Sequence, residues 1–110
     1  MLESAKNTLT LTARIVEVKT LRYTPAGVPV LELLLEHQAE VTEAGRKRQV
    51  QLTIAAVAMG DIGLLLADCT LGTYLEATGF LAATRKGSRR LNFHIQKAQR
   101  LSAGYDPSSV

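Results

Sequence analysis

Segments with the residue pattern of β-strands follow one another along most of this chain, and their order constrains the fold more than any other feature. Between Asn7 and Lys19, apolar and polar residues alternate as in a half-buried strand. The adjacent apolar pair Ile15-Val16 breaks the alternation and predicts a β-bulge. The other strand-like segments are Val28–His37, Gln49–Met59, Leu71–Leu81 and Leu91–Leu101.

Glycine-containing turns separate these segments. Arg22–Gly27 has the composition of a turn in which Pro25 presets φ, and Pro29 then suits the beginning of the next strand. The polar stretch Glu40–Arg48 predicts a second hairpin loop centred on Ala44-Gly45. Gly87-Ser88 is the expected tip of a third hairpin, between the last two strands.

Gly60–Cys69 is the best helix candidate, with Asp61 as the expected cap, and its two glycines predict that the helix is brief. The order is strand, strand, strand, short helix, strand, strand. We therefore expect an all-β protein with the OB fold, a five-stranded Greek-key barrel with one short helix between strands 3 and 4. Other five-stranded barrels remain open at this point.

The length of 110 residues suits one domain, and a hydrophobic content of 46% is sufficient for a packed core. We expect a flexible N-terminus at residues 1–6, an OB-fold domain at 7–101 and a flexible C-terminal tail at 102–110. A single cysteine, Cys69, excludes an internal disulfide and fits a reducing compartment. The first residues lack the apolar core of a signal peptide, and no apolar run reaches about 18 residues. The expectation is a soluble, cytoplasmic protein without membrane contact.

Charge is segregated along the chain, although the formal net charge is only +3. One cationic cluster is Arg46, Lys47 and Arg48; the other is Arg85, Lys86, Arg89 and Arg90. No Asp or Glu occurs between Ala77 and Ala103, whereas acidic residues gather in the first half. Such segregation indicates a partner, and cationic tips on a β-scaffold suit an anionic polymer better than a merely solvated surface.

Aromatic side chains are few, and those outside the core could serve as platforms for base stacking. Tyr23, in a turn, and Phe93, after polar Asn92, are the candidates, while Phe80 among apolar neighbours is expected in the core. His37 and His94 are expected to be structural, because neither has cysteine or carboxylate partners at metal-ligand spacing. No catalytic motif is found, so we expect no enzyme, no metal site and no cofactor.

Three stretches give the chain a family resemblance. They are Leu21–Pro29 with its Pro-x-Gly-x-Pro turn, Leu35-Glu36-His37 followed by Glu43-Ala44-Gly45 and Arg48-Gln49, and Gly79-Phe80-Leu81 before the basic loop. Together they resemble the primosomal replication protein N (PriB) family, relatives of bacterial single-stranded DNA-binding protein, from about Leu9 to Leu101.

The resemblance implies a homodimer of OB domains that binds single-stranded DNA and acts in the restart of stalled replication forks. It implies the PriA helicase as a partner and, in some lineages, the DnaT protein. The family contacts DNA through the loops between strands 4 and 5 and between strands 2 and 3. The matching positions here are Arg85, Lys86, Arg89 and Arg90 in the first loop, Arg48 in the second, and Arg22 in the first turn.

This chain departs from the family pattern in the second loop, where some members carry aromatic residues and this chain has Arg46–Gln51 without a ring. The departure predicts binding dominated by phosphate contacts and strongly dependent on salt. It also favours one alternative, an interaction module that mainly docks the helicase. Two further alternatives are a general single-stranded DNA-binding protein and an RNA-binding OB domain. Leu31, Leu33 and Leu35, with Leu34 opposite, suggest surplus apolar surface for a dimer.

Overall fold

Strands make up most of the computed structural model, which describes residues 5–107. The predicted flexibility of residues 1–4 and 108–110 concerns positions outside the described residues, and the predicted domain bounds stay a prediction. Along the chain the elements are β1 (Leu9–Val18), β2 (Arg22–Tyr23), β3 (Pro29–Glu43), β4 (Arg46–Met59), α1 (Asp61–Leu66), β5 (Tyr74–Ala83) and β6 (Leu91–Arg100).

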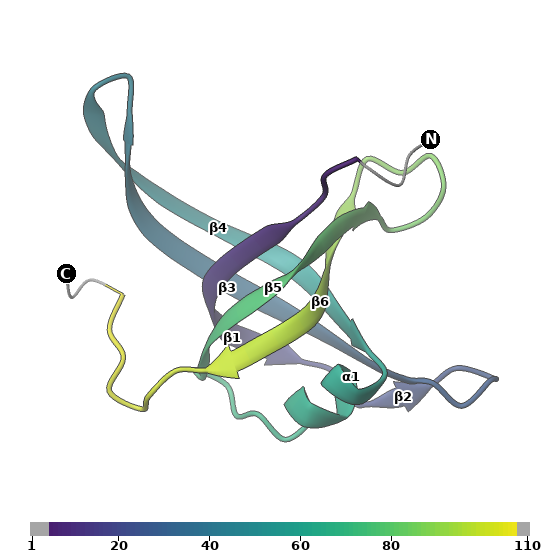
Figure 1. Cartoon of the computed structure of the whole chain (residues 1–110). Coiled ribbons are helices and arrows are strands. Elements are labelled where there is room, and N and C mark those ends of the chain that lie inside the picture. Colours follow the sequence, from purple (N-terminus) through teal and green to yellow (C-terminus); the bar gives the residue numbers. More distant parts are fainter. Residues whose placement is uncertain (1–4, 108–110) are drawn as a thin grey trace.

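Five of these strands close into a barrel (Figure 1). Their order is β1-β5-β6-β4-β3, and pairing of β1 with β3 completes the circle. All pairs are antiparallel except β4 with β6. With the short helix between β4 and β5, this is the OB fold, and the predicted fold class is confirmed. The two-residue strand β2, which the sequence did not predict, pairs with the start of β3 in the predicted turn region.

Strand β1 pairs with two different strands because it bends. Its first half, from Leu9 to Arg14, pairs with β5, and its second half, from Arg14 to Val18, pairs with β3. The register against β3 shifts between Ile15 and Glu17, which confirms the bulge predicted at Ile15-Val16. A bulge increases local twist, and here it allows one strand to close the barrel.

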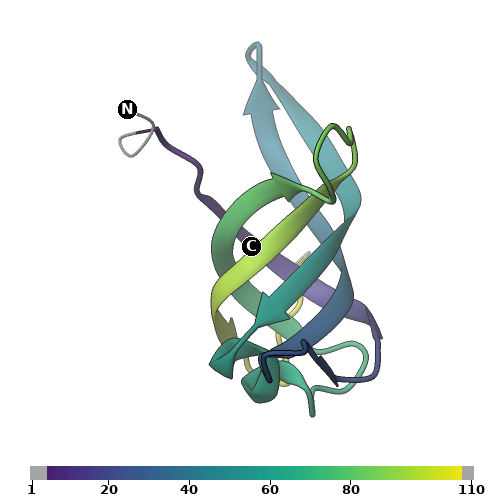
Figure 2. The ribbon, with the colours of Figure 1, turned by 90° about the vertical axis from the view of Figure 1, so that its right-hand side faces the viewer.

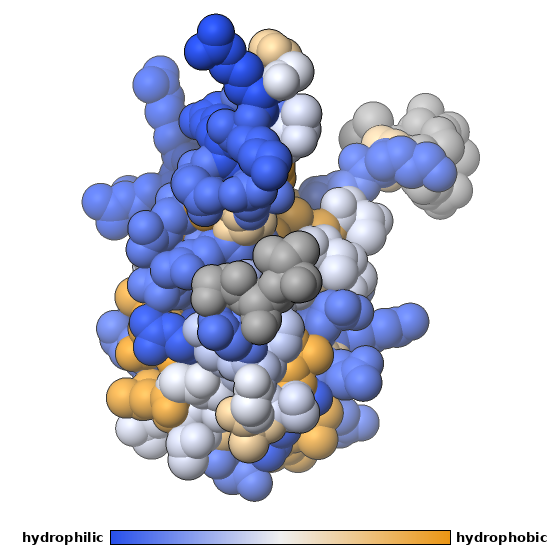
Figure 3. Space-filling view, turned by 90° about the vertical axis from the view of Figure 1, so that its left-hand side faces the viewer, coloured by the Kyte–Doolittle hydropathy of each residue, from blue (hydrophilic) through white to orange (hydrophobic). Residues whose placement is uncertain are grey.

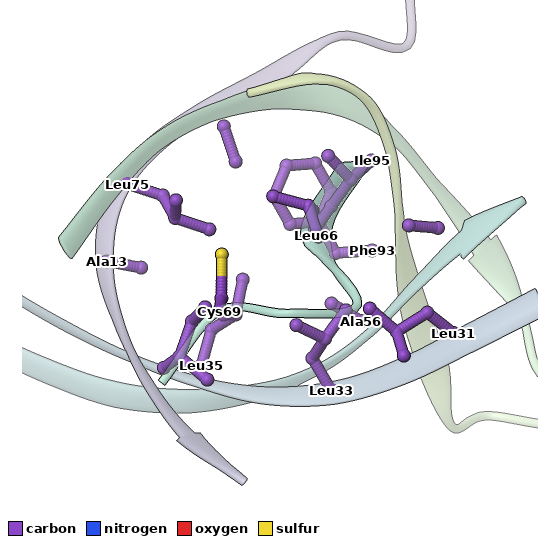
Figure 4. Packing of buried hydrophobic residues seen from close by; sticks show 13 residues of the cluster. Ala13, Leu31, Leu33, Leu35, Ala56, Leu66, Cys69, Leu75, Phe93 and Ile95 are labelled. Atoms are coloured by element: carbon purple, nitrogen blue, oxygen red, sulfur yellow. The ribbon is translucent and has the colours of Figure 1, made fainter. Parts of the chain in front are cut away.

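The barrel interior is filled by aliphatic side chains and one aromatic ring (Figure 4). Leu31, Leu33 and Leu35 all point inward and are at most 4% exposed. The suggestion that these leucines supply apolar surface for a dimer was therefore wrong, because the barrel itself buries them. Cys69 is also in this cluster, and burial raises the pKa of its thiol.

The short helix α1 lies across one end of the barrel, where Leu66 enters the core. Gly60, with φ of 81°, occupies the N-cap position, and Asp61 is the first helical residue without a side-chain capping bond. The prediction that Asp61 caps the helix was thus wrong by one residue. Gly63 allows close packing, since a β-carbon there would lie 2.7 Å from the carbonyl oxygen of Ala58.

The hairpin of β3 and β4 is much longer than the barrel needs. Its ladder runs without interruption from Val30 opposite Met59 to Glu43 opposite Arg46. The pairing of β3 with β1 extends only to Glu36, so the rest projects as an arm (Figure 1). We call residues 38–51 the arm. The predicted hairpin and its centre at Ala44-Gly45 are confirmed, but the loop is much shorter than Glu40–Arg48, because Ala44 and Gly45, with φ of 52° and 76°, close the hairpin as a two-residue turn.

Candidate nucleic-acid interface

The connection between β5 and β6, residues 84–90, carries four of the candidate cations; we call it the β5–β6 loop. Its base is closed by a backbone bond from the Thr84 amide to the Arg90 carbonyl, at 2.9 Å. Inside it, the Ser88 amide donates to the Arg85 carbonyl across Gly87, whose φ is 81°. A turn of this type needs a positive φ at its third residue, which explains why glycine is there.

Side chains within the loop hold its backbone and leave its cations unoccupied. The Thr84 hydroxyl donates to Ser88 Oγ, and Ser88 Oγ accepts from the Arg90 amide, both at 3.0 Å. Arg85, Lys86, Arg89 and Arg90 are exposed. Within residues 5–107, none of their side chains forms an ion pair or side-chain hydrogen bond. Four cations with free donors on an ordered turn can bind phosphate groups.

The cations at the tip of the arm are in a different electrostatic environment. Arg48 binds Glu43 at 2.6 Å, and Lys47 lies 3.8 Å from Glu40. Glu40 also accepts a hydrogen bond from the side-chain Nε2 of Gln49, at 2.7 Å. Only Arg46 of this cluster has no such partner in the described part of the chain. The ladder explains these contacts, because opposite and diagonal residues on one face of a hairpin are neighbours.

The remaining basic candidate, Arg22, lies at the other end of the barrel. Figures 1 and 2 show β2 beside α1, whereas the arm and the β5–β6 loop both leave the opposite end. Arg22 lies 3.6 Å from Glu32. Its neighbour Tyr23 is 59% exposed, so its ring remains open to stacking. The structure therefore does not bring these two residues together with the loop cations.

The arm and the β5–β6 loop leave the same end of the barrel (Figures 1 and 2), and Figure 1 shows them at opposite corners of it. Figure 3, viewed from the arm side, shows the arm as a hydrophilic projection. The candidate residues thus lie on two separate cationic projections, and more of the cations are free to bind a ligand on the β5–β6 loop than on the arm. Strand β2 is a third element, far from both.

Phe93 was a wrong choice as a stacking platform. Its side chain is fully buried in the barrel core, because its position in β6 faces inward with Ile95. Phe80 was expected in the core, and this prediction was also wrong. Phe80 is half-buried on the outer face, opposite His94 in the ladder, and the two rings are parallel with centroids 4.8 Å apart.

Two features of the interface were missed from the sequence. The Phe80–His94 pair could not be found without the register of β5 against β6, which shifts at Thr78 and Gly79. The ion pairs of the arm had a detectable signal. Folding the chain about Ala44-Gly45 places Glu43 opposite Arg46 and Glu40 opposite Gln49. The prediction placed the hairpin centre at Ala44-Gly45 but did not extend strand pairing into Glu40–Arg48.

Some polar side chains outside these candidates connect neighbouring elements of the barrel. His37 Nδ1 contacts the Thr12 carbonyl at 2.7 Å, and Arg14 binds Glu36 at 2.9 Å between β1 and β3. The hydrogen bond to Glu36 raises the pKa of Arg14. In the same way, the hydrogen bond to Asp68 raises the pKa of Arg100. Residues 5–107 contain no cluster of His, Cys, Asp or Glu suited to hold a metal ion. The same residues include no helix with the length and hydropathy to span a membrane.

Comparison with known proteins assigns the barrel to a family. A family model described as another single-strand binding protein family matches residues 7–97. The replication restart protein PriB of Bordetella pertussis is 55% identical over 103 residues, covering 92% of this chain and 96% of its own. This chain belongs to the PriB family. The PriB of Neisseria meningitidis serogroup B is 37% identical over 93 residues, covering 84% of this chain and 92% of its own.

Solved structures agree with this assignment. PriB from Ralstonia solanacearum superimposes with a TM-score of 0.79 and 41% identity, covering 87% of this chain and 98% of that one. The single-stranded DNA-binding protein of Thermus aquaticus gives a TM-score of 0.71 at 22% identity, over 90% of this chain and 52% of that one. The second likeness shows a shared fold, and the first agrees with membership of the PriB family.

Proposed function

We propose that this protein binds single-stranded DNA as an accessory factor of replication restart, with the β5–β6 loop as its main phosphate contact. The observation that carries the proposal is the loop itself, in which Arg85, Lys86, Arg89 and Arg90 are exposed and, within residues 5–107, unpaired on an OB barrel. No acidic residue between Ala77 and Ala103 competes for them. Membership of the PriB family, whose members are named replication restart proteins, supports the same role.

Fluorescence anisotropy at several salt concentrations tests this proposal. Labelled single-stranded and duplex oligodeoxynucleotides should both be titrated, with the single strand binding more tightly because only it can follow a curved cationic surface. The logarithm of the affinity should fall with that of the salt concentration by about 0.7 for each phosphate neutralised. Equal affinity for the duplex, or no dependence on salt, would contradict the proposal. An oligoribonucleotide of the same sequence separates DNA binding from the RNA-binding alternative.

The partners implied are the PriA helicase and, in some lineages, DnaT. We propose that the protein stimulates PriA at stalled forks while it holds the single strand. A second candidate, a module that mainly docks the helicase, is favoured by one observation: two of the three arm cations are already paired with carboxylates. A helicase assay with loop variants that no longer bind DNA separates the two. Full stimulation by those variants would support docking alone.

A homodimer forms part of the proposal. It is supported by unpaired strand edges, since within the described residues β1 pairs with β5 alone before Arg14, and β3 pairs with β4 alone beyond Glu36. Such edges can accept a strand from another chain. Sedimentation equilibrium should give a dimer, and a monomer at micromolar concentration would exclude it.

A further inference from the structure

A shallow hollow lies on the outer face of the barrel, where β4, β5 and β6 meet the start of α1. Its volume of about 420 Å³ falls in the usual range of ligand sites, about 300–1,000 Å³. Most of its lining surface is apolar or aromatic. Its lining side chains include Val57, Met59, Asp61, Phe80, His94 and Gln96.

The rings of Phe80 and His94 stack on each other at the wall of this hollow. They are parallel within 6°, with centroids 4.8 Å apart. Gly79 makes the arrangement possible, because a β-carbon there would lie 1.7 Å from the His94 carbonyl oxygen. The absence of a side chain lets β5 and β6 approach closely beside the register shift. Both rings are only half-buried and line the hollow, so part of the aromatic surface is accessible from it.

The hollow lies within reach of a strand held by the β5–β6 loop. Phe80 precedes Thr84 by four residues and His94 follows Arg90 by four, which is about 13 Å at the rise of a β-strand. In Figure 2, the paired parts of β4 and β6 face the viewer, with the loop above them and β2 below. A single strand leaving the loop toward Arg22 and Tyr23 of β2 would cross this face.

We propose that the hollow is a base-binding subsite for single-stranded nucleic acid, in which one base stacks on the Phe80–His94 pair. The inference rests on the proposed function and adds where a base is held. Apolar walls and the Asp61 carboxylate disfavour a charged phosphate group. An uncharged base can instead pack against the apolar walls and form hydrogen bonds with the carboxylate. Within residues 5–107, Asp61 has no side-chain partner, so its carboxylate and the Gln96 amide can form hydrogen bonds with a base edge.

The subsite compensates for the rings that the arm lacks. Stacking on an aromatic side chain contributes to single-strand affinity without sequence preference, because every base has a flat face. The β5–β6 loop would fix the phosphates and the hollow would hold one base between the loop and β2. Phosphate contacts and base contacts then lie on the same hairpin, at its tip and on its outer face.

An abasic oligonucleotide separates the two kinds of contact. A short oligodeoxycytidylate and the same sugar-phosphate chain without bases carry equal charge. Fluorescence anisotropy should show the wild-type protein binding the base-bearing chain at least about fivefold more tightly, as expected for one stacked base. Phe80→Leu, which keeps an apolar side chain, should reduce this ratio toward one with an unchanged salt slope. Circular dichroism checks that the variant is folded.

A second variant leaves both rings in place. Met59→Glu, at a position 47% exposed, sets a charge at the rim of the hollow and should also reduce the ratio. Leu71→Glu, at a position 65% exposed outside the hollow, is the charge-matched control and should keep the wild-type ratio.

The two kinds of failure can be told apart. Equal wild-type affinity for the two chains, or an unchanged ratio in folded Phe80→Leu, overturns the subsite and leaves phosphate binding by the loop intact. No binding of either chain at low salt overturns the proposed function, and the subsite falls with it.

Discussion

The β5–β6 loop and the arm carry similar cationic clusters but differ in what surrounds each charge. In the loop, hydroxyl groups of Thr84 and Ser88 organise the backbone, and no carboxylate is near in sequence. In the arm, β-ladder geometry sets Glu40 and Glu43 beside Lys47 and Arg48. A cation that must break an ion pair with a carboxylate before it binds a phosphate contributes less binding free energy than a free cation does. Counting basic residues therefore overestimates the arm as a DNA contact.

Removing the loop cations should have the largest effect. Substituting Ala for Arg85, Lys86, Arg89 and Arg90 leaves up to four phosphates of the DNA without a cationic partner. At 0.1 M salt, single-strand affinity should fall roughly 100-fold or more, and the salt slope should decrease by about 0.7 for each phosphate that is no longer neutralised. Anisotropy titrations measure both quantities. If the decrease in affinity is no larger than that caused by changing Arg46, Lys47 and Arg48 of the arm to Ala, the β5–β6 loop is not the main DNA-binding element.

Removing the arm cations should have a smaller effect, although three are substituted. With Arg46, Lys47 and Arg48 changed to Ala, only Arg46 is removed as a free cation. We expect about a fivefold decrease in affinity at 0.1 M salt and a slope change near 0.7. The same titrations check this, and a slope change of about 2, from three phosphates at about 0.7 each, would mean that the ion pairs of the arm open freely when DNA binds.

Neutralising the arm carboxylate that binds Arg48 should increase affinity. Glu43→Gln frees the guanidinium, so single-strand binding should strengthen about two- to fivefold at 0.1 M salt with a steeper salt dependence. Glu76→Gln on β5 removes the same charge from an exposed position without an ion pair in residues 5–107 and is the matched control. Equal gains in the two variants would indicate a general effect of net charge.

Exchanging alanine and glycine in the turn of the arm and in the β5–β6 loop should change the free energy of unfolding in opposite directions. Ala44 has φ of 52°, a region that is strained for residues with a side chain, so Ala44→Gly should raise the free energy of unfolding by up to about 1 kcal/mol. Gly87→Ala, at φ of 81°, should lower it by about 1 kcal/mol. Denaturant titrations measure both changes. Destabilisation by Ala44→Gly would contradict the two-residue turn of the arm.

Local patterns were sufficient for the fold but not for every element boundary. Alternation, the bulge at Ile15-Val16 and the glycine-rich helix predicted the OB barrel. The β5 strand begins at Tyr74 rather than Leu71, and β3 and β4 extend far into the expected loop. From Thr42 to Gln49 every residue except Ala44 and Gly45 is polar, so the pattern there cannot distinguish paired strands from a loop.

The sequence by itself determined the all-β barrel, its family, and the cationic loop free of acidic neighbours, because these depend on residue order and local composition. Only the tertiary structure decided which cations are available, which ring is buried and which is exposed. Those properties depend on strand register. A shift of one residue exchanges the faces of a strand, and it was register that buried Phe93, set Phe80 against His94 and paired Arg48 with Glu43.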